Sequence, residues 1–388
     1  MKLIYAFSEG FPSTDTQCIQ ALRTCYGLAS NGCQVDLLIG KSSGGRLAEI
    51  LPFYGLQENP NLTIHRLPIL RNEISKILPF SWNGLFHLLC LAAIMYLNRD
   101  KTYQAIYLRH PKLAIFLTTF RNLHNLPVIY EAHELFHLNE DLLDIKRVNR
   151  LRTMEARIFG SADVIVSITE NLQKAIVKDF GPNTSVWVIP DGTDIPASVC
   201  LPKSQLKQNI ICYMGQLYPW KGVDTLLMAM SLIDNASLEI IGGEPADINR
   251  LKILAKEQGV LEKVRFRGMI KPAEVFQNLC QASVAVLPAT SRLISSRFTS
   301  PLKLFEYMAC RIPIVAANVP SYREVLVHGR NALLVNPEDP VDLASGIRSL
   351  LNDPELAKRI ARQAFLDVQE FTWAKRGQRI IEVVESLE

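Results

Sequence analysis

Short apolar runs alternate with segments of helical periodicity along almost the whole chain. A helix is predicted at Gln17–Asn31, where Gly32 provides a stop. Runs of apolar residues bounded by turn residues indicate strands, and this alternation is typical of parallel α/β layers. In the first half the predicted strands are Lys2–Phe7, Gln34–Ile39, Leu62–Arg66, Ala105–Leu108, Val128–Glu131, Ala162–Ile168 and Ser185–Ile189.

The pattern restarts after the polar stretch Ile195–Gln208, which has little periodicity and indicates a linker. The predicted organisation is a first domain over 1–195, a linker over 196–208, a second domain over 209–370 and a final helix within 371–388. Two such sheets imply a cleft, and ligands favour the carboxyl ends of parallel strands. The second set of strands is Ile210–Tyr213, Leu238–Ile241, Val264–Phe266, Ser283–Leu287, Pro313–Ala316 and Ala332–Val335, with helices at Gly222–Ser231, Asp342–Asn352, Pro354–Leu366 and Trp373–Leu387.

Composition describes an ordinary globular protein of 388 residues, with 48% hydrophobic and 21% charged residues. A net charge of +4, without a dense basic run, gives no reason to expect nucleic acid as a partner. The apolar run at the N-terminus is too short for a signal peptide and indicates a first strand. The eight cysteines form no Cys-x-x-Cys pair, which predicts reduced, mostly buried thiols in a cytoplasmic protein and no zinc site.

The segment Ile77–Leu97 is long and apolar enough to raise the question of a membrane. Pro79, Asn83 and His87 make it a poor span, so a buried or interface-lying helix is the preferred interpretation. Together with nearby Arg66, Arg71 and Lys76, the segment is compatible with an acceptor at the inner face of a membrane, and equally with a helix packed in the first domain.

The segment from Arg297 to Glu306 reads as the start of a helix that binds an anion. Thr299 or Ser300 is the predicted N-cap and Pro301 the first helical residue. Free amides at a helix start favour a negative group, and two nearby cations, Arg297 and Lys303, add charge. Leu302, Lys303 and Glu306 share one face, so a phosphate followed by a polyol would fit. A helix that begins in this way is also common without any ligand.

Three further candidate sites follow predicted strands. The loop Gly215–Gly222 allows a close backbone approach and carries Lys221, which could neutralise phosphate. Glu131 and His133 lie at the end of a strand, where a histidine can hydrogen-bond a sugar or transfer protons. The polar loop after the first strand holds Asp15 and Thr16, which could shape an acceptor or phosphate pocket. The loop Gly215–Gly222 also has a purely structural interpretation as a strand–helix loop, and His133 has one as a histidine bonded to neighbouring backbone.

Several nucleotide and catalytic motifs are absent from the sequence. It contains no Gly-x4-Gly-Lys-Ser/Thr loop, no Gly-x-Gly-x-x-Gly, no His-Glu-x-x-His and no Asp-x-Asp pair. A bound diphosphate would therefore be neutralised by Lys, Arg and helix amides, and we expect neither a metal nor a resident cofactor.

The motifs in their order resemble retaining glycosyltransferases of family four, which have the GT-B fold of two Rossmann-like domains. The resemblance covers nearly the whole chain. It is carried by YMGQLYPWKGVDTLLMAM, LEIIGGEP, VRFRGMI, TSPLKLFEYMACRIPIVA and GRNALLVNPED in the second half, and by GLASNGCQVDLL, VIYEAHELF, ADVIVSITENL and VIPDGTD in the first.

The resemblance implies a nucleotide-sugar donor on the second domain and an acceptor on the first, with the last helix crossing back onto the first domain. Gly215 and Lys221 match the loop of the donor phosphates, and His133 matches a histidine of the cleft. Glu306 matches the acid that contacts the ribose. The diphosphate would lie at Ser300, Pro301, Leu302 and Lys303, and the base near Arg267, Gly268 and Met269.

Two positions depart from the family pattern. Many members carry Glu-x7-Glu, whose first acid contacts the donor sugar, but counting back from Glu306 reaches Phe298. Many also have an arginine where Gln216 stands, and the hypothesis is that Arg297 or Arg292 supplies that charge instead. The sugar contact is therefore expected from other groups, or the sugar differs.

The expected function is metal-independent transfer of a sugar from a nucleotide-diphosphate sugar to an acceptor hydroxyl, with retention, in polysaccharide or glycolipid assembly. The predicted catalytic set is Lys221, Arg297, Glu306 and His133. The acceptor is expected to be a carbohydrate or a lipid-linked sugar, which leaves a peripheral membrane contact open. Two alternatives remain: a sugar-nucleotide epimerase or hydrolase of the same fold, or an inactive sugar-nucleotide-binding scaffold, which Phe298 would support.

Overall fold

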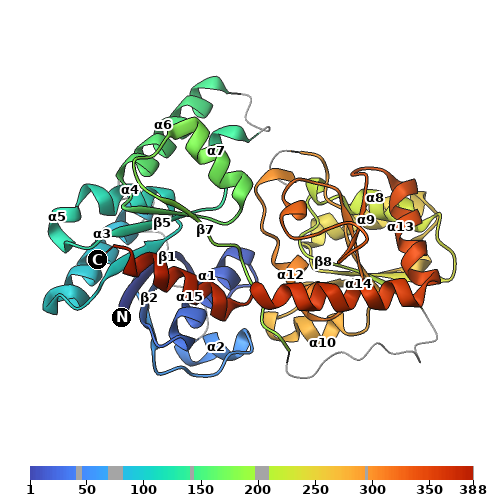
Figure 1. The fold of residues 1–388 in the computed structure, drawn as a ribbon, viewed down its shortest axis with the longest axis horizontal. Coiled ribbons are helices and arrows are strands. Elements are labelled where there is room, and N and C mark those ends of the chain that lie inside the picture. Colours follow the sequence, from blue (N-terminus) through green and yellow to red (C-terminus); the bar gives the residue numbers. More distant parts are fainter. Residues whose placement is uncertain (41–45, 69–81, 140–143, 197–208, 293–295, 388) are drawn as a thin grey trace. The chain divides into compact units, whose positions relative to one another are not determined.

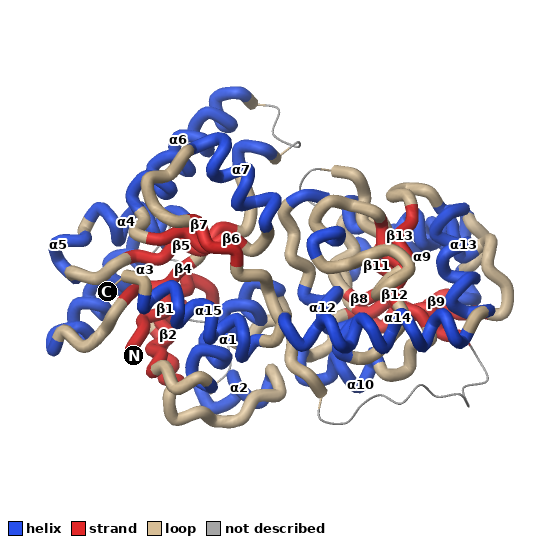
Figure 2. Tube along the Cα trace, in the orientation of Figure 1, coloured by secondary structure: helices blue, strands red, loops and turns tan. Residues whose placement is uncertain are grey.

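The computed structural model describes residues 1–40, 46–68, 82–139, 144–196, 209–292 and 296–387. Its chain forms two compact units, the first made of Met1–Pro190 with Trp373–Glu388 and the second of Asp191–Thr372. The predicted linker falls largely outside the described residues, as does the beginning of the apolar segment Ile77–Leu97. Figure 2 shows each unit as a row of strands with helices on both sides.

The first unit is built on a parallel sheet of seven strands in the order β3-β2-β1-β4-β5-β6-β7. Its central strands are buried on both faces, which explains why they read as continuous apolar runs. The strands are β1 (Lys2–Gly10), β2 (Gln34–Gly40), β3 (Leu62–Arg66), β4 (Ala105–Leu108), β5 (Val128–Ala132), β6 (Val164–Ser167) and β7 (Val186–Val188).

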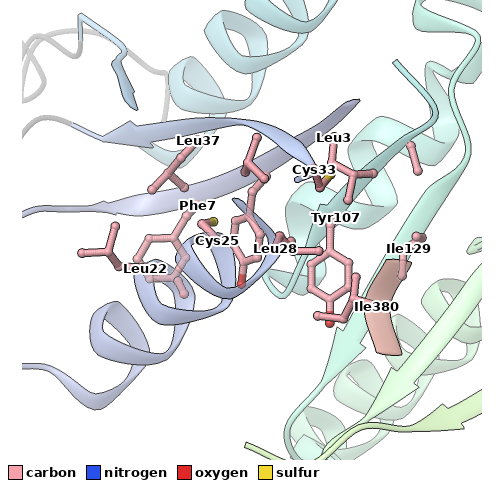
Figure 3. Close-up of a cluster of buried hydrophobic side chains, with 14 of the residues drawn as sticks. Leu3, Phe7, Leu22, Cys25, Leu28, Cys33, Leu37, Tyr107, Ile129 and Ile380 are labelled. Carbon is pink, nitrogen blue, oxygen red and sulfur yellow. The ribbon is translucent and has the colours of Figure 1, made fainter. Parts of the chain in front are cut away.

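Helices cover this sheet, and the last helix of the chain is one of them. They are α1 (Thr16–Ser30), α2 (Ile50–Phe53), α3 (Trp82–Leu97), α4 (Pro111–Thr119), α5 (Arg121–His124), α6 (Ile145–Ser161), α7 (Glu170–Phe180) and α15 (Trp373–Glu385). Figure 1 shows α15, in red, against α1. Ile380 of α15 lies in the same core as Leu22 and Leu28 of α1 and Tyr107 of β4 (Figure 3).

The second unit repeats the design with a parallel sheet of six strands in the order β10-β9-β8-β11-β12-β13. They are β8 (Asn209–Met214), β9 (Ala236–Ile241), β10 (Val264–Gly268), β11 (Val284–Leu287), β12 (Ile314–Ala317) and β13 (Leu333–Val335). Its helices are α8 (Val223–Met230), α9 (Pro245–Glu257), α10 (Val275–Leu279), α12 (Leu302–Ala309), α13 (Pro340–Asn352) and α14 (Pro354–Asp367). The predicted class, two parallel Rossmann-like α/β sheets, is confirmed.

Two of the sequence-based expectations concern a membrane-spanning helix and the redox state of the cysteines. Among the described residues no helix is long and apolar enough to cross a bilayer. Contact with a membrane face stays a prediction. Cys280 is disulfide-bonded, so the expectation of reduced thiols throughout is wrong at this position. The other described cysteines are free and buried, namely Cys18, Cys25, Cys33, Cys90, Cys212 and Cys310.

Candidate functional site

Two glycines bring the backbone together where β8 and β9 end. Gly215 has φ +135° and Gly242 φ +110°, a region that side chains rarely adopt. A Cβ on Gly242 would lie 2.4 Å from the Gly215 carbonyl oxygen, so only glycine fits there. The Gly215 amide donates to the Ile241 carbonyl at 2.8 Å. This edge is the carboxyl end of the sheet, where ligands of such folds bind.

The loop after Gly215 keeps one polar atom buried and unpaired. The side-chain oxygen Oε1 of Gln216 has no hydrogen-bond partner within the described part of the chain. The backbone carbonyl of the same residue accepts from the Tyr213 hydroxyl at 2.7 Å, which holds the loop against β8. An unpaired buried acceptor costs about 1–3 kcal/mol, so a ligand that donates to Gln216 would recover this energy.

Helix α12 packs beside the same loop and begins one residue later than predicted. Its first residue is Leu302, and its N-cap is Pro301, which makes no side-chain cap. The predicted N-cap of Thr299 or Ser300 is therefore wrong, because the Ser300 hydroxyl instead accepts from the backbone amide of Asp191 at 3.1 Å. The Thr299 hydroxyl oxygen lies 3.5 Å from the Ser321 hydroxyl oxygen.

A hydrogen bond ties α12 to the end of β8. The Met214 amide donates to the Tyr307 hydroxyl at 2.7 Å. Leu302 points its side chain into the interior, with 7% exposed, so only its backbone is available to a ligand. This anchoring places the second helical residue, Lys303, beside Gly215: a Cβ built there would lie 3.3 Å from the Lys303 Nζ.

Lys303 and Lys221 form a pair of desolvated cations. Lys303 Nζ lies 4.0 Å from the centroid of the Tyr213 ring. Burial holds the pKa of Lys303 well below its usual range, the charge of Lys221 lowers it further, and Glu306 opposes both effects. Burial likewise lowers the pKa of Lys221. Both lysines are half-buried, and two like charges at such a site are costly unless an anion joins them, so the arrangement suits a phosphate or diphosphate.

Glu306 and Arg297 occupy different settings near this pair. Glu306 lies on α12, half-buried, one turn after Lys303. Arg297 is exposed and lies in a short helical turn with Ser296. Phe298, at the position where the family pattern has an acid, is buried with 5% of its surface exposed. This position is therefore apolar in the structure and offers no polar group to a sugar.

The predicted base segment follows β10 and joins the same edge. The Gly242 amide donates to the Gly268 carbonyl at 2.7 Å, which links this segment to the end of β9. Arg267 is engaged elsewhere, because its guanidinium pairs with Glu239 at 3.1 Å and donates to Asn278. Met269 remains 38% exposed and is available for contact.

The remaining predicted residues lie in the first unit. Asp15 and Thr16 are exposed at the start of α1, after β1. Glu131 lies near the end of β5 and is fully buried, so its contact with a ligand stays a prediction. His133 is 18% exposed, and its Nε2 lies 2.5 Å from Glu131 Oε1. Strands β1 and β5 end at the same edge of the parallel sheet.

Sequence reasoning missed three contributors to these sites. Tyr213 and Gly242 shape the surroundings of Lys303, and a Gly-Gly pair directly after a strand was the available signal for Gly242. Arg376, which reaches Glu131, lies on the last helix and had no local signal. In the described ranges, no cluster of three His, Cys, Asp or Glu side chains is arranged to hold a metal ion.

Comparison with known families matches the chain in two parts. Residues 19–196 match the family described as Glycosyltransferase Family 4, and residues 202–367 match Glycosyl transferases group 1. A D-inositol 3-phosphate glycosyltransferase of Corynebacterium jeikeium is 24% identical over 292 residues, which cover 69% of this chain and 68% of that protein. The protein of the same name from Corynebacterium diphtheriae is 24% identical, and 65% of its length is covered.

Solved structures show the same fold over the full length. The sucrose-phosphate synthase of Thermosynechococcus elongatus superposes with a TM-score of 0.78 at 20% identity, covering 100% of this chain and 98% of that one. The Anabaena protein HepE, solved in complex with UDP and glucose, superposes with a TM-score of 0.73 at 18% identity, covering 100% of both chains.

Proposed function

We propose that this chain moves a sugar from a nucleotide-diphosphate sugar to an acceptor hydroxyl. It carries both glycosyltransferase domains and is therefore a glycosyltransferase of the GT-B fold. The observation that carries the proposal is the pair formed by Lys303, which lies beside Gly215, and Lys221, whose charge acts on Lys303; both have a lowered pKa. Within the described part of the chain neither lysine forms an ion pair with a carboxylate. A diphosphate would supply the missing negative charge.

In this proposal the second unit holds the donor. The diphosphate lies between Lys221, Lys303 and the amides at the start of α12, and the exposed Arg297 adds a third cation. As the bond from sugar to phosphate breaks, negative charge grows on the diphosphate. Preorganised donors in a dry site stabilise charge that develops in this way more than water does. The Glu306 carboxylate accepts from the ribose hydroxyls.

The first unit receives the acceptor, near His133 and the exposed Asp15 and Thr16. We infer that transfer proceeds with retention, as the resemblance to retaining glycosyltransferases of family four implies. We also infer that it needs no metal, because two lysines and helix amides can neutralise the diphosphate. Phe298 supports a donor sugar held by groups other than the usual acid. The relatives support transfer over an epimerase or hydrolase, since those reported are a glycosyltransferase and a synthase by name.

A thermal-shift screen against nucleoside diphosphates tests the donor site and the independence from metal together. We expect one nucleoside diphosphate to raise the melting temperature, since a ligand at 100 times its Kd stabilises the folded state by about 2.7 kcal/mol. UDP is the first to test, because HepE was solved with it. The shift should persist in EDTA. The matching monophosphate should give a smaller shift, because it brings less charge to the lysines.

Two results would contradict this. If no nucleoside diphosphate shifts the melting temperature, there is no donor site. If EDTA abolishes the shift, a metal and not the lysine pair holds the diphosphate. Donor binding without transfer to any carbohydrate acceptor would favour the inactive scaffold that Phe298 suggests, and release of free sugar without acceptor would favour a hydrolase.

The affinity for the nucleoside diphosphate should weaken as pH rises, starting below the usual lysine pKa of 10.5. The anion binds the protonated lysines, whose pKa values are lowered, so their charge is lost at lower pH than for exposed lysines. The stability of the unliganded protein changes with pH in the opposite direction. Between the lowered pKa and 10.5 the unfolded chain binds more protons than the folded one, so the lysines' contribution to stability rises with pH.

Melting curves with and without UDP from pH 6 to 10 measure both effects. An affinity that stays constant over this range would show that the two lysines do not carry the binding charge. Lys221→Ala removes one of the titrating groups, so the fall in affinity with pH should be shallower in that variant.

A further inference from the structure

Arg376 of the last helix reaches four groups that lie far away in the sequence. Its guanidinium donates to Glu131 Oε2 at 2.5 Å and to Thr24 Oγ1 at 3.0 Å. It also donates to the carbonyls of Ile189 and Pro190, each at 2.7 Å. Pro190 is the last residue before the chain enters the second unit. The Arg376 side chain therefore connects helix α15 to strand β5, to helix α1 and to the residues Ile189 and Pro190, which lead into the second unit.

Two glycines let α15 come close enough to α1 for this reach. A Cβ on Gly27 would lie 2.1 Å from the Trp373 carbonyl oxygen, and one on Gly377 would lie 2.4 Å from the Gly27 carbonyl carbon. The Asn31 side chain adds a hydrogen bond to the Ala374 carbonyl at 2.8 Å. Backbone contacts this close require glycine on both helices, so the position of Arg376 is set by packing and not by its own contacts alone.

The carboxylate that Arg376 holds also contacts His133. Glu131 Oε1 lies 2.5 Å from His133 Nε2 and accepts from Gln20 Nε2 at 2.6 Å. The Tyr107 hydroxyl donates to Oε2. Arg109 joins the network through Gln20, to which it donates at 3.0 Å. Glu131 has no exposed surface, whereas His133 and Arg109 are both partly exposed.

The charge on Glu131 decides which way the bond to His133 runs. Burial alone would raise the pKa of Glu131, but Arg376 first, then His133, and Arg109 after them hold it well below its usual range. An ionised carboxylate only accepts, so Nε2 of the ring must carry the proton. Without Arg376 the desolvated carboxyl loses its largest counter-charge and takes up a proton from solvent. It then donates to Nε2, and the ring keeps its proton on Nδ1.

We propose that Arg376 is a positioning residue for His133, acting through Glu131. It keeps the carboxylate ionised, which fixes the protonated nitrogen and the orientation of the ring that meets the substrate. The inference rests on the proposed function for the role of His133 in transfer, but its structural part stands alone. The site in the first unit is completed only after the chain has passed through the second unit and returned as α15.

Ring ¹⁵N NMR of the full-length protein with labelled histidine tests this, with His133→Gln identifying the signals. At pH 8 we expect Nε2 of His133 to be protonated in the wild type and in Arg376→Lys. In Arg376→Met we expect Nε2 to become an unprotonated acceptor while Nδ1 carries the proton. In the transfer assay, Arg376→Met should lower kcat by ~10–100-fold with the donor KM unchanged, by analogy with the loss of an orienting partner at metal-bound histidines. Arg376→Lys should recover part of it.

A protonated Nε2 in Arg376→Met would overturn the proposal, whatever the activity. So would a loss of activity in Arg376→Lys as large as in Arg376→Met. If Arg376→Met does not fold, the double variant with Glu131→Gln removes both charges and leaves no buried ion unpaired. The glutamine amide then donates to Nε2, so the proton should again lie on Nδ1. A wild type that transfers no sugar would refute the proposed function, while the NMR result would still decide the linkage.

Discussion

Lys221→Ala is expected to lower kcat by about 10²–10³-fold while the protein stays folded, which is the usual cost of removing one preorganised donor to a developing anion. The same change removes a charge that burial and the neighbouring Lys303 make unfavourable in the unliganded protein. The melting temperature without ligand should therefore stay equal or rise. Opposite effects on activity and on stability distinguish a functional lysine from a structural one.

Steady-state kinetics and melting curves measure the two effects. Lys256→Ala is the matched control, because Lys256 is exposed on α9 of the same unit, and it should leave both quantities unchanged. Near-normal turnover in Lys221→Ala would refute the assignment of the donor site. A large fall in melting temperature would instead show that Lys221 holds the loop in place.

Glu306→Gln should raise the donor KM by about 10–100-fold, because a hydrogen bond to a charged group contributes about 1.5–3 kcal/mol and an amide replaces it only in part. Glutamine keeps the size of the side chain, so α12 should pack as before. The charge of Glu306 also supports the protonated form of Lys303, so its removal should shift the loss of nucleotide affinity to lower pH.

A double-mutant cycle locates the partner of Glu306 on the ligand. Binding of UDP and of 2′,3′-dideoxy-UDP is compared in the wild type and in Glu306→Gln. If the carboxylate meets the ribose, the variant and the dideoxy ligand each lose affinity, and together they lose little more than either alone. Fully additive losses would show that Glu306 acts elsewhere. Glu257→Gln, an exposed change at the end of α9, is the control.

The strands could be predicted from the sequence because their signal is local. Ile165 and Val166 in β6, or Val315 and Ala316 in β12, lie in a parallel sheet that is covered on both faces, and such strands read as unbroken apolar runs. Each predicted strand appears within a few residues of its expected bounds. The helix that starts near Thr16 and the one that ends the chain were predictable from period and turn residues for the same reason.

The candidate site was only partly predictable. Gly215, Lys221, Lys303 and Glu306 carry recognisable signals, because each stands after a strand or in the first turns of a helix. The cap of α12 was not predictable, since the hydroxyl of Ser300 is taken by the amide of Asp191, a residue 109 positions away. The ion pair between Arg267 and Glu239 could not be predicted from the sequence for the same reason.

Local patterns along the chain were enough to predict two parallel α/β sheets, the loops that follow their strands and the kinds of charged residue in those loops. Period, capping and turn chemistry act over a few residues, so they can be read along the chain. Lys303 comes to lie half-buried beside Gly215 only when the chain folds, and Arg376 then pairs with Glu131, which is 245 positions away. Desolvation and charge pairing depend on distance through space, and packing alone sets that distance.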